Sequence, residues 1–167
     1  ILPSLCDEGP SISERKYEFG FQGALHKHRN DFFKRLEKKK IFVHYLSRVK
    51  FNDFLKTVQN IKVFVYNENS AISINGKKKS INGLWGKCLT VAGRGCFVLR
   101  NYDESADAYG INELPSVFTF TNEKEIPNII EKIKSLSSIE MDSLRSQTVK
   151  TLIKRNDWLS IIKEIES

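Results

Sequence analysis

The sequence predicts an α/β fold, a Rossmann-like, doubly wound parallel sheet of about five strands with extra helices at the carboxyl end. Two observations predict it. Short segments that are apolar almost throughout, which suit strands buried on both faces, alternate with segments whose apolar residues recur at helical spacing. The composition, 40% hydrophobic and 28% charged, is typical of a globular domain. Because crossovers between parallel strands are right-handed, we expect helices on both faces of the sheet.

Residues 1–16 contain two prolines and several serines without periodicity, so we expect a linker or tail there and one domain over residues 17–167. Alternating aromatic residues ending at Gly23 predict the first strand, and Phe32 with Leu36 gives the next segment one apolar helical face. The elements predicted in this part are strand Tyr17–Gln22, helix 28–38, strand 41–46, helix Phe51–Val58 and strand Ile61–Tyr66.

Residues 67–81 are polar and basic, and we expect a loop there. Leu84, Cys88 and Val91 then recur at helical spacing. The elements expected after the loop are helix 83–93, strand 96–99, a second loop over 100–115, strand Val117–Phe120 and the helices 123–136, 139–153 and 157–165.

The formal net charge of +7 is unevenly distributed. Residues 1–100 hold 19 basic and 8 acidic side chains, a net charge of +11, whereas residues 101–167 hold 8 basic and 12 acidic, a net charge of −4. The first part therefore favours a phosphate, a polyanion or an acidic surface as a partner. The alternative is a lysine-rich composition without a ligand, since lysine outnumbers arginine 19 to 8.

The sequence excludes or disfavours several classes of protein and of functional site. No apolar run approaches the ~20 residues of a membrane helix. Cys88 and Cys96 lie in apolar stretches without a CxxC pair, which favours buried reduced thiols and a cytoplasmic protein. The three histidines lack metal-ligand spacing, so we expect neither a metal nor another cofactor. No hydrolase or DxD motif is present, and catalytic residues stay unassigned.

Candidate binding residues follow the strands, because open parallel sheets bind ligands beyond the carboxyl ends of their strands. Gly23, His26 and Arg29 come after the first strand, at the start of a helix. The glycine permits close backbone approach, and a helix N-terminus with a cation attracts an anion. The segment lacks the GxGxxG pattern, which disfavours a nicotinamide dinucleotide. A solvated first helical turn is the alternative.

A second group follows the third strand. Asn82, Gly83 and Lys87 lie where the next helix begins and are candidates for a second phosphate contact. Lys77, Lys78 and Lys79 precede them and suit a solvated loop. Glu104 follows the fourth strand and is a candidate for contacting ligand hydroxyl groups.

The segment 83–99 (GLWGKCLTVAGRGCFVL) resembles the helix-and-strand segment in the carboxyl-terminal, donor-binding domain of GT-B glycosyltransferases of the group 1 type. The family's basic residue falls on Lys87 and its glycine on Gly95, whereas its usual glutamate falls on Thr90. Residues 17–29 and 117–136 are similar to that domain's first strand with its loop and to its last strand with its helix, and Trp158 opens a final helix as in the family.

This resemblance implies a glycosyltransferase that takes a nucleotide-diphosphate sugar, with Gly23, Arg29 and Lys87 facing the diphosphate and Thr90 near the ribose or sugar. It implies no metal, an acceptor that is a glycan or a lipid-linked glycan, as in polysaccharide biosynthesis, and peripheral contact with the inner face of the membrane. The acceptor site would lie on a preceding amino-terminal domain. The chain starts at Ile1 and its single methionine is Met141, so we expect a fragment or a processed chain.

The alternative function is a non-catalytic module that binds a nucleotide or a phosphorylated ligand, which Thr90 at the glutamate position favours. Threonine offers one short hydroxyl in place of a charged, bidentate acceptor. Nucleic acid is not expected as a partner, because the basic residues fall on opposite helix faces and no RNP-type aromatic motif is present.

Overall fold

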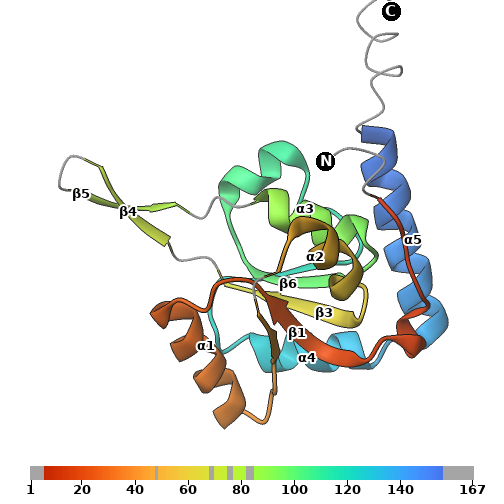
Figure 1. Cartoon of the computed structure of the whole chain (residues 1–167), viewed down its shortest axis with the longest axis horizontal. Helices are drawn as coiled ribbons and strands as arrows, with labels where there is room; N and C mark the ends of the chain where they lie inside the picture. The colour runs from red at the N-terminus through yellow and green to blue at the C-terminus, as the bar shows by residue number, and fades with distance from the viewer. Residues whose placement is uncertain (1–5, 48, 68–69, 75–76, 82–84, 156–167) are drawn as a thin grey trace, which may run out of the picture.

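The computed structural model describes residues 6–47, 49–67, 70–74, 77–81 and 85–155. It confirms the predicted fold class, since five parallel strands form one sheet in the order β2-β1-β3-β6-β7 and helices cover both of its faces (Figure 1). The strands are β1 (Tyr17–Gln22), β2 (His44–Leu46), β3 (Ile61–Tyr66), β6 (Phe97–Asn101) and β7 (Val117–Phe120).

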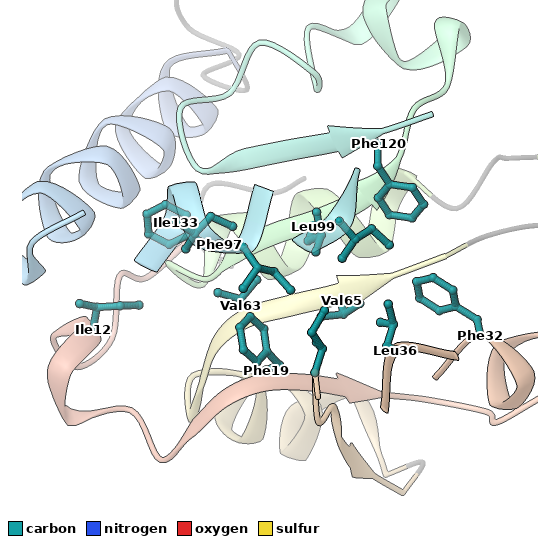
Figure 2. Close-up of a cluster of buried hydrophobic side chains, with 13 residues drawn as sticks. Ile12, Phe19, Phe32, Leu36, Val63, Val65, Phe97, Leu99, Phe120 and Ile133 are labelled. Atoms are coloured by element: carbon teal, nitrogen blue, oxygen red, sulfur yellow. The ribbon is translucent and has the colours of Figure 1, made fainter. Parts of the chain in front are cut away.

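Two apolar layers hold the helices on the sheet. One layer joins β1, β3 and β6 to α1 and α4, through Phe32 and Leu36 on α1 and Ile130 and Ile133 on α4, and Figure 2 shows part of this cluster. The other layer packs the opposite helices, α2 and α3, and the end of α5 against the same strands. The helices are α1 (Lys27–Lys38), α2 (Phe51–Val58), α3 (Trp85–Gly93), α4 (Ile126–Lys134) and α5 (Ser138–Arg155).

The largest error of the sequence prediction concerns residues 67–81, which were expected to form a loop. Instead, β4 (Ser70–Ile74) and β5 (Lys77–Ile81) pair antiparallel as a ribbon that projects from the domain (Figure 1). The overlooked signal is the alternation Ile72, Ser73, Ile74, followed by an Asn-Gly dipeptide that is typical of hairpin turns.

Smaller differences concern the ends of elements. The strand expected over 41–46 is limited to His44–Leu46, and β6 continues to Asn101. A 3₁₀ turn, Glu104–Tyr109, lies in the expected loop 100–115. The helix expected over 157–165, with Trp158, lies outside the described residues.

The described part of the amino-terminal segment, residues 6–16, packs on the domain and is not a tail, which corrects the prediction for residues 1–16. Ile12 is 1% exposed within the core. The backbone N–H of Ile12 donates to the carboxylate of Asp142 on α5 (2.9 Å), and the hydroxyl of Ser11 donates to the same carboxylate (2.7 Å). The segment therefore fastens α5 to the amino edge of the sheet.

Arg15 completes this attachment from inside the protein. Its side chain is 3% exposed, and its Nη1 donates to the carbonyl of Ile61 at the start of β3 (2.9 Å). Its Nη2 donates to the carbonyls of Glu8 (2.7 Å) and Arg94 (3.1 Å). One guanidinium thus satisfies carbonyls from three separate segments, which the periodicity of the sequence does not reveal.

No helix within the described residues is long and apolar enough to cross a membrane.

We predict that Arg15→Ala lowers the free energy of unfolding by about 2–4 kcal/mol, because the carbonyls of Ile61 and Arg94 lose this donor and that of Glu8 keeps only Arg145. Arg35→Ala is the matched control, since Arg35 is half-exposed and pairs with Glu123 at the surface. Arg35→Ala should lower the free energy of unfolding by less than about 1 kcal/mol. Urea denaturation measures both values, and equal losses would contradict a structural role for Arg15.

Candidate functional site

The candidate site lies at the carboxyl edge of the sheet, where β1 stands between β2 and β3. The chain runs from β1 to β2 on one side, and β3 adds on the other side of β1, so the order of the strands reverses there. Doubly wound sheets bind their ligands at such a switch point. Residues that follow β1 and β3 are therefore the ones to examine.

Gly23 follows the last residue of β1 and has a φ of +147°. A Cβ atom at this position would lie 2.5 Å from Nζ of Lys87 and 3.2 Å from the ring of Phe21. The backbone here is thus approached closely by a side chain of α3, and a larger residue would displace that lysine. The space beside the Gly23 backbone, where the sequence leads us to expect a ligand, is taken by the side chain of Lys87.

Arg29 lies in the first turn of α1 and is 6% exposed. Its Nη1 donates to the carbonyl of Ala24 in the loop between β1 and α1 (2.5 Å). Its guanidinium carbon lies 4.6 Å from the centre of the Phe21 ring and 5.8 Å from that of the Tyr66 ring at the end of β3. Arg29 is therefore held on the switch point and is not part of a solvated helical turn.

Lys87 approaches the same ring from α3. Its Nζ donates to the carbonyl of Gln22 and lies 4.8 Å from the centre of the Phe21 ring. The rings of Phe54 and Phe64 lie 5.4 and 5.8 Å from the same nitrogen. The ammonium of Lys87 is half-buried among aromatic faces, and a charge in surroundings of low polarity exerts a strong field on a nearby anion.

Three residues thus lie together around Phe21: Gly23, Arg29 and Lys87, which the family resemblance implies would face one diphosphate. The ring of Phe21 is fully buried and came from outside the set of predicted residues. Its position at the end of β1, two residues before Gly23, was the signal in the sequence that could have identified it.

His26 stands at the N-cap of α1 with its backbone carbonyl accepting from the N–H groups of Arg29 and Asn30 (both 3.0 Å). Its exposed ring stacks on His28, with the ring centres 6.1 Å apart. Burial, then the charges of Arg29 and His26, hold the pKa of His28 below its usual value. The first turn of α1 therefore has a positive potential, which the helix N-terminus reinforces.

The other predicted residues are placed as follows. Asn82 and Gly83 lie outside the described residues. Thr90 is half-buried on α3, about one turn beyond Lys87. Glu104 is exposed at the start of the 3₁₀ turn after β6, and no described hydrogen bond or ion pair joins it to Gly23 or the two cations.

Three buried polar side chains at the carboxyl ends of adjacent strands were missed. They are Gln22 at the end of β1, Asn67 after β3 and Arg100 in β6, with exposed fractions of 1%, 4% and 2%. Each has a buried atom without a hydrogen-bond partner among the described residues: Oε1 of Gln22, Oδ1 of Asn67 and Nη1 of Arg100. Such atoms carry a desolvation cost that a polar ligand could remove. A polar residue that ends an apolar strand was the available signal.

Arg100 connects to the site through β3. It is paired in register with Tyr66, whose ring Arg29 approaches. Its Nε donates to the carbonyl of Asn101 (3.2 Å), and no carboxylate of the described residues lies within ion-pair distance. A buried cation so placed favours an anionic ligand.

Within the described part of the chain, no three His, Cys, Asp or Glu side chains are grouped so that they could hold a metal ion.

Comparison with known proteins gives one informative result. No family model matches the chain, and no curated protein matches it. Among solved structures, the chain is similar to AviGT4, described as a glycosyltransferase involved in avilamycin A biosynthesis, with a TM-score of 0.50 and 10% sequence identity. The match covers 99% of this chain and 56% of that one. It shows a shared Rossmann-like fold, and this chain spans little more than half the length of that glycosyltransferase.

We predict that an anion bound at the start of α1 raises the pKa of His28, because it offsets the repulsion from Arg29 and His26. An NMR titration of the His28 ring protons with and without UDP measures the change. Uridine, which lacks the diphosphate, is the control and should leave the pKa in place. An unchanged pKa in the presence of saturating UDP would show that the diphosphate binds elsewhere.

We also predict that Arg100→Met leaves the free energy of unfolding unchanged or raises it, because a buried cation with an unpartnered donor is removed. Pyrophosphate should then raise the thermal midpoint of the wild-type chain more than that of the variant. Thermal unfolding with and without pyrophosphate tests this. Equal increases of the thermal midpoint in the wild type and the variant would show that Arg100 does not contribute to anion binding.

Proposed function

We propose that the chain is the donor-binding domain of a GT-B-type glycosyltransferase, which transfers a sugar from a nucleotide-diphosphate sugar to a glycan or a lipid-linked glycan. The observation that carries the proposal is the convergence of Gly23, Arg29 and Lys87 around Phe21 at the switch point of the sheet. The fold shared with a glycosyltransferase over 99% of this chain supports it.

In this proposal the two cations bind the diphosphate. Arg29 presents a planar guanidinium that can donate two parallel hydrogen bonds to phosphate oxygens, and Lys87 supplies a point charge. Gly23 leaves room for Lys87 beside the backbone, and the N–H groups of the first turn of α1 would face the same anion as that lysine. The nucleotide therefore lies across the carboxyl ends of β1 and β3.

The same groups explain how transfer would be accelerated. As the bond between the sugar and the diphosphate breaks, negative charge accumulates on the leaving phosphate oxygens. Cations that are already fixed in surroundings of low polarity stabilise that charge without reorganising, which is usually a large contribution to catalysis. This step requires no metal. The breaking bond's electron pair stays on the diphosphate, and the acceptor hydroxyl loses its proton to a group outside this domain.

Thr90 and Glu104 are the residues proposed for the ribose or the sugar. Thr90 is on the same helix as Lys87, so its hydroxyl could reach a part of the donor adjacent to the diphosphate. Glu104 is exposed and would need the donor to extend past β6. Asn82 and Gly83 remain candidates for a second phosphate contact. The acceptor site belongs in this proposal to an amino-terminal domain.

The second candidate is a non-catalytic module that binds a nucleotide or a phosphorylated ligand. Threonine at position 90, where the resemblance expects glutamate, favours it. Both candidate functions predict that the chain binds a diphosphate. Only the glycosyltransferase predicts that the sugar of a nucleotide-diphosphate sugar is transferred or hydrolysed when an amino-terminal domain is present. Release of nucleoside diphosphate from its sugar ester is the discriminating measurement.

Calorimetric titration of the chain with UDP, GDP and CDP tests the shared part of the proposal, with a mixed-sequence oligonucleotide as competitor. Nucleoside diphosphates should bind, and oligonucleotide binding should be weaker. Oligonucleotide binding that falls steeply with salt, without any response to a nucleoside diphosphate, would contradict the proposal.

We predict that Lys87→Gln weakens diphosphate binding by about 1–3 kcal/mol, because the amide can still donate to the carbonyl of Gln22 but carries no charge. Lys34→Gln, on the exposed face of α1, is the matched control and should bind as the wild type does. Titration calorimetry and thermal unfolding are measured together. A lower thermal midpoint with unchanged affinity for the diphosphate would show that Lys87 is a structural residue.

A further inference from the structure

The unsatisfied polar atoms at the carboxyl edge of the sheet are of two chemical kinds. Oε1 of Gln22 and Oδ1 of Asn67 are hydrogen-bond acceptors, whereas Nη1 of Arg100 is a cationic donor, and none of the three has a partner within the described part of the chain. The residues are only 1%, 4% and 2% exposed, so bulk water has little access to these atoms. A ligand that satisfies all three must therefore supply hydrogen donors as well as an anion.

The strand register places two of these side chains in one row across the sheet. Arg100 in β6 is paired with Tyr66, the last residue of β3. The register of β1 with β3, continued to the ends of both strands, sets Gln22 level with Tyr66. Level residues of neighbouring parallel strands lie on the same face of a sheet. Gln22 and Arg100 therefore flank Tyr66 on one face, and Asn67 directly follows Tyr66 in the chain.

This row lies beside the proposed diphosphate site. The guanidinium carbon of Arg29 is 5.8 Å from the centre of the Tyr66 ring, and Arg100 is on the strand that flanks β3 on the side away from β1. Two strand spacings, about 10 Å, separate β1 from β6. A donor whose phosphate is bound by Arg29 can therefore reach Arg100 with a group that lies one sugar ring farther on.

We propose that the donor sugar carries a carboxylate that Arg100 binds, so that the substrate is a nucleotide-diphosphate sugar of the hexuronate class. The inference rests on the proposed function, because Arg29 and Lys87 hold the diphosphate from which the sugar extends. The carboxylate accepts from Nη1 of Arg100, and hydroxyl groups of the sugar donate to the amide oxygens of Gln22 and Asn67. One sugar acid thus supplies both kinds of partner.

A carboxylate fits Arg100 better than the other groups that a donor could present. A neutral sugar hydroxyl can accept from the guanidinium, but it leaves a buried charge without a counterion, which is costly. A second phosphate would supply the charge but no hydrogen donors for the two amide oxygens. The chain itself offers no substitute among the described residues, since none of their carboxylates is within ion-pair distance of Arg100.

Titration with glucuronic acid 1-phosphate and glucose 1-phosphate tests the proposal without depending on the nucleotide base. The two ligands differ only at C6, where the first has a carboxylate and the second a hydroxymethyl group. NMR titration of the full chain, followed on the backbone amide signals, measures both dissociation constants. The wild type should bind the glucuronate roughly tenfold more tightly or better, as expected for a charge-assisted hydrogen bond in a buried place.

Variants of Arg100 assign that preference to its side chain. Arg100→Met should bind the two sugar phosphates with nearly equal affinity, and any effect of the lost charge on the phosphate cancels in the ratio. Arg100→Lys keeps the charge without the planar guanidinium and should retain part of the preference. Arg35→Met removes a half-exposed arginine from the surface of α1 and is the matched control, which should keep the wild-type ratio.

Two results would overturn the inference while pyrophosphate still binds to the chain. The wild type could bind the two sugar phosphates equally, or Arg100→Met could keep the full preference for the glucuronate, which would then come from the overall positive charge of the domain. If neither pyrophosphate nor a nucleoside diphosphate binds, the proposed function fails and this inference fails with it. Pyrophosphate titration thus separates the two failures, and thermal unfolding shows whether each variant is folded.

Discussion

The arrangement at the carboxyl edge depends on the ring of Phe21. It is fully buried at the end of β1, and its contacts reach Phe33 on α1, Tyr45 on β2 and Phe64 on β3. The two cations of the candidate site lie 4.6 and 4.8 Å from its centre. One ring thus joins the strands at the switch point to cations from two helices on opposite faces of the sheet. A smaller residue there would leave a cavity and would also release both cations from their positions.

The two edges of the sheet use buried arginines differently. At the amino edge, both terminal nitrogens of Arg15 donate to backbone carbonyls, and the segment that carries it is tied to α5. At the carboxyl edge, Nη1 of Arg100 has no hydrogen-bond partner within the described part of the chain, although the side chain is 2% exposed. A donor satisfied by the backbone stabilises the fold, whereas a buried donor without an acceptor lowers stability until a ligand supplies one. Nε of Arg15 is also buried without a hydrogen-bond partner among the described residues, so the two arginines differ only in their terminal nitrogens: those of Arg15 hold three backbone segments, whereas Nη1 of Arg100 has no acceptor.

The sequence predicted the parallel sheet because its strands are buried on both faces and their apolar runs are unbroken, as in Ile61–Tyr66. It singled out Gly23, Arg29 and Lys87 as candidates because their places relative to strand ends are local properties. Other features arise from tertiary packing between residues that are distant in the sequence. They are the strand register that sets Arg100 beside Tyr66 and the burial of Arg15 against three separate segments. Periodicity contains no information on such contacts, so these residues could not be predicted from it.

The net charge has two separate origins in the structure. Arg29 and Lys87 are held inward on aromatic faces, where low polarity strengthens their interaction with a single anion. Lys40 and Lys50, on either side of β2, are exposed, so water and salt screen them. The hydroxyl of Tyr45 on β2 donates to the carbonyl of Gly23, so the edge strand helps to fix the backbone that borders Lys87.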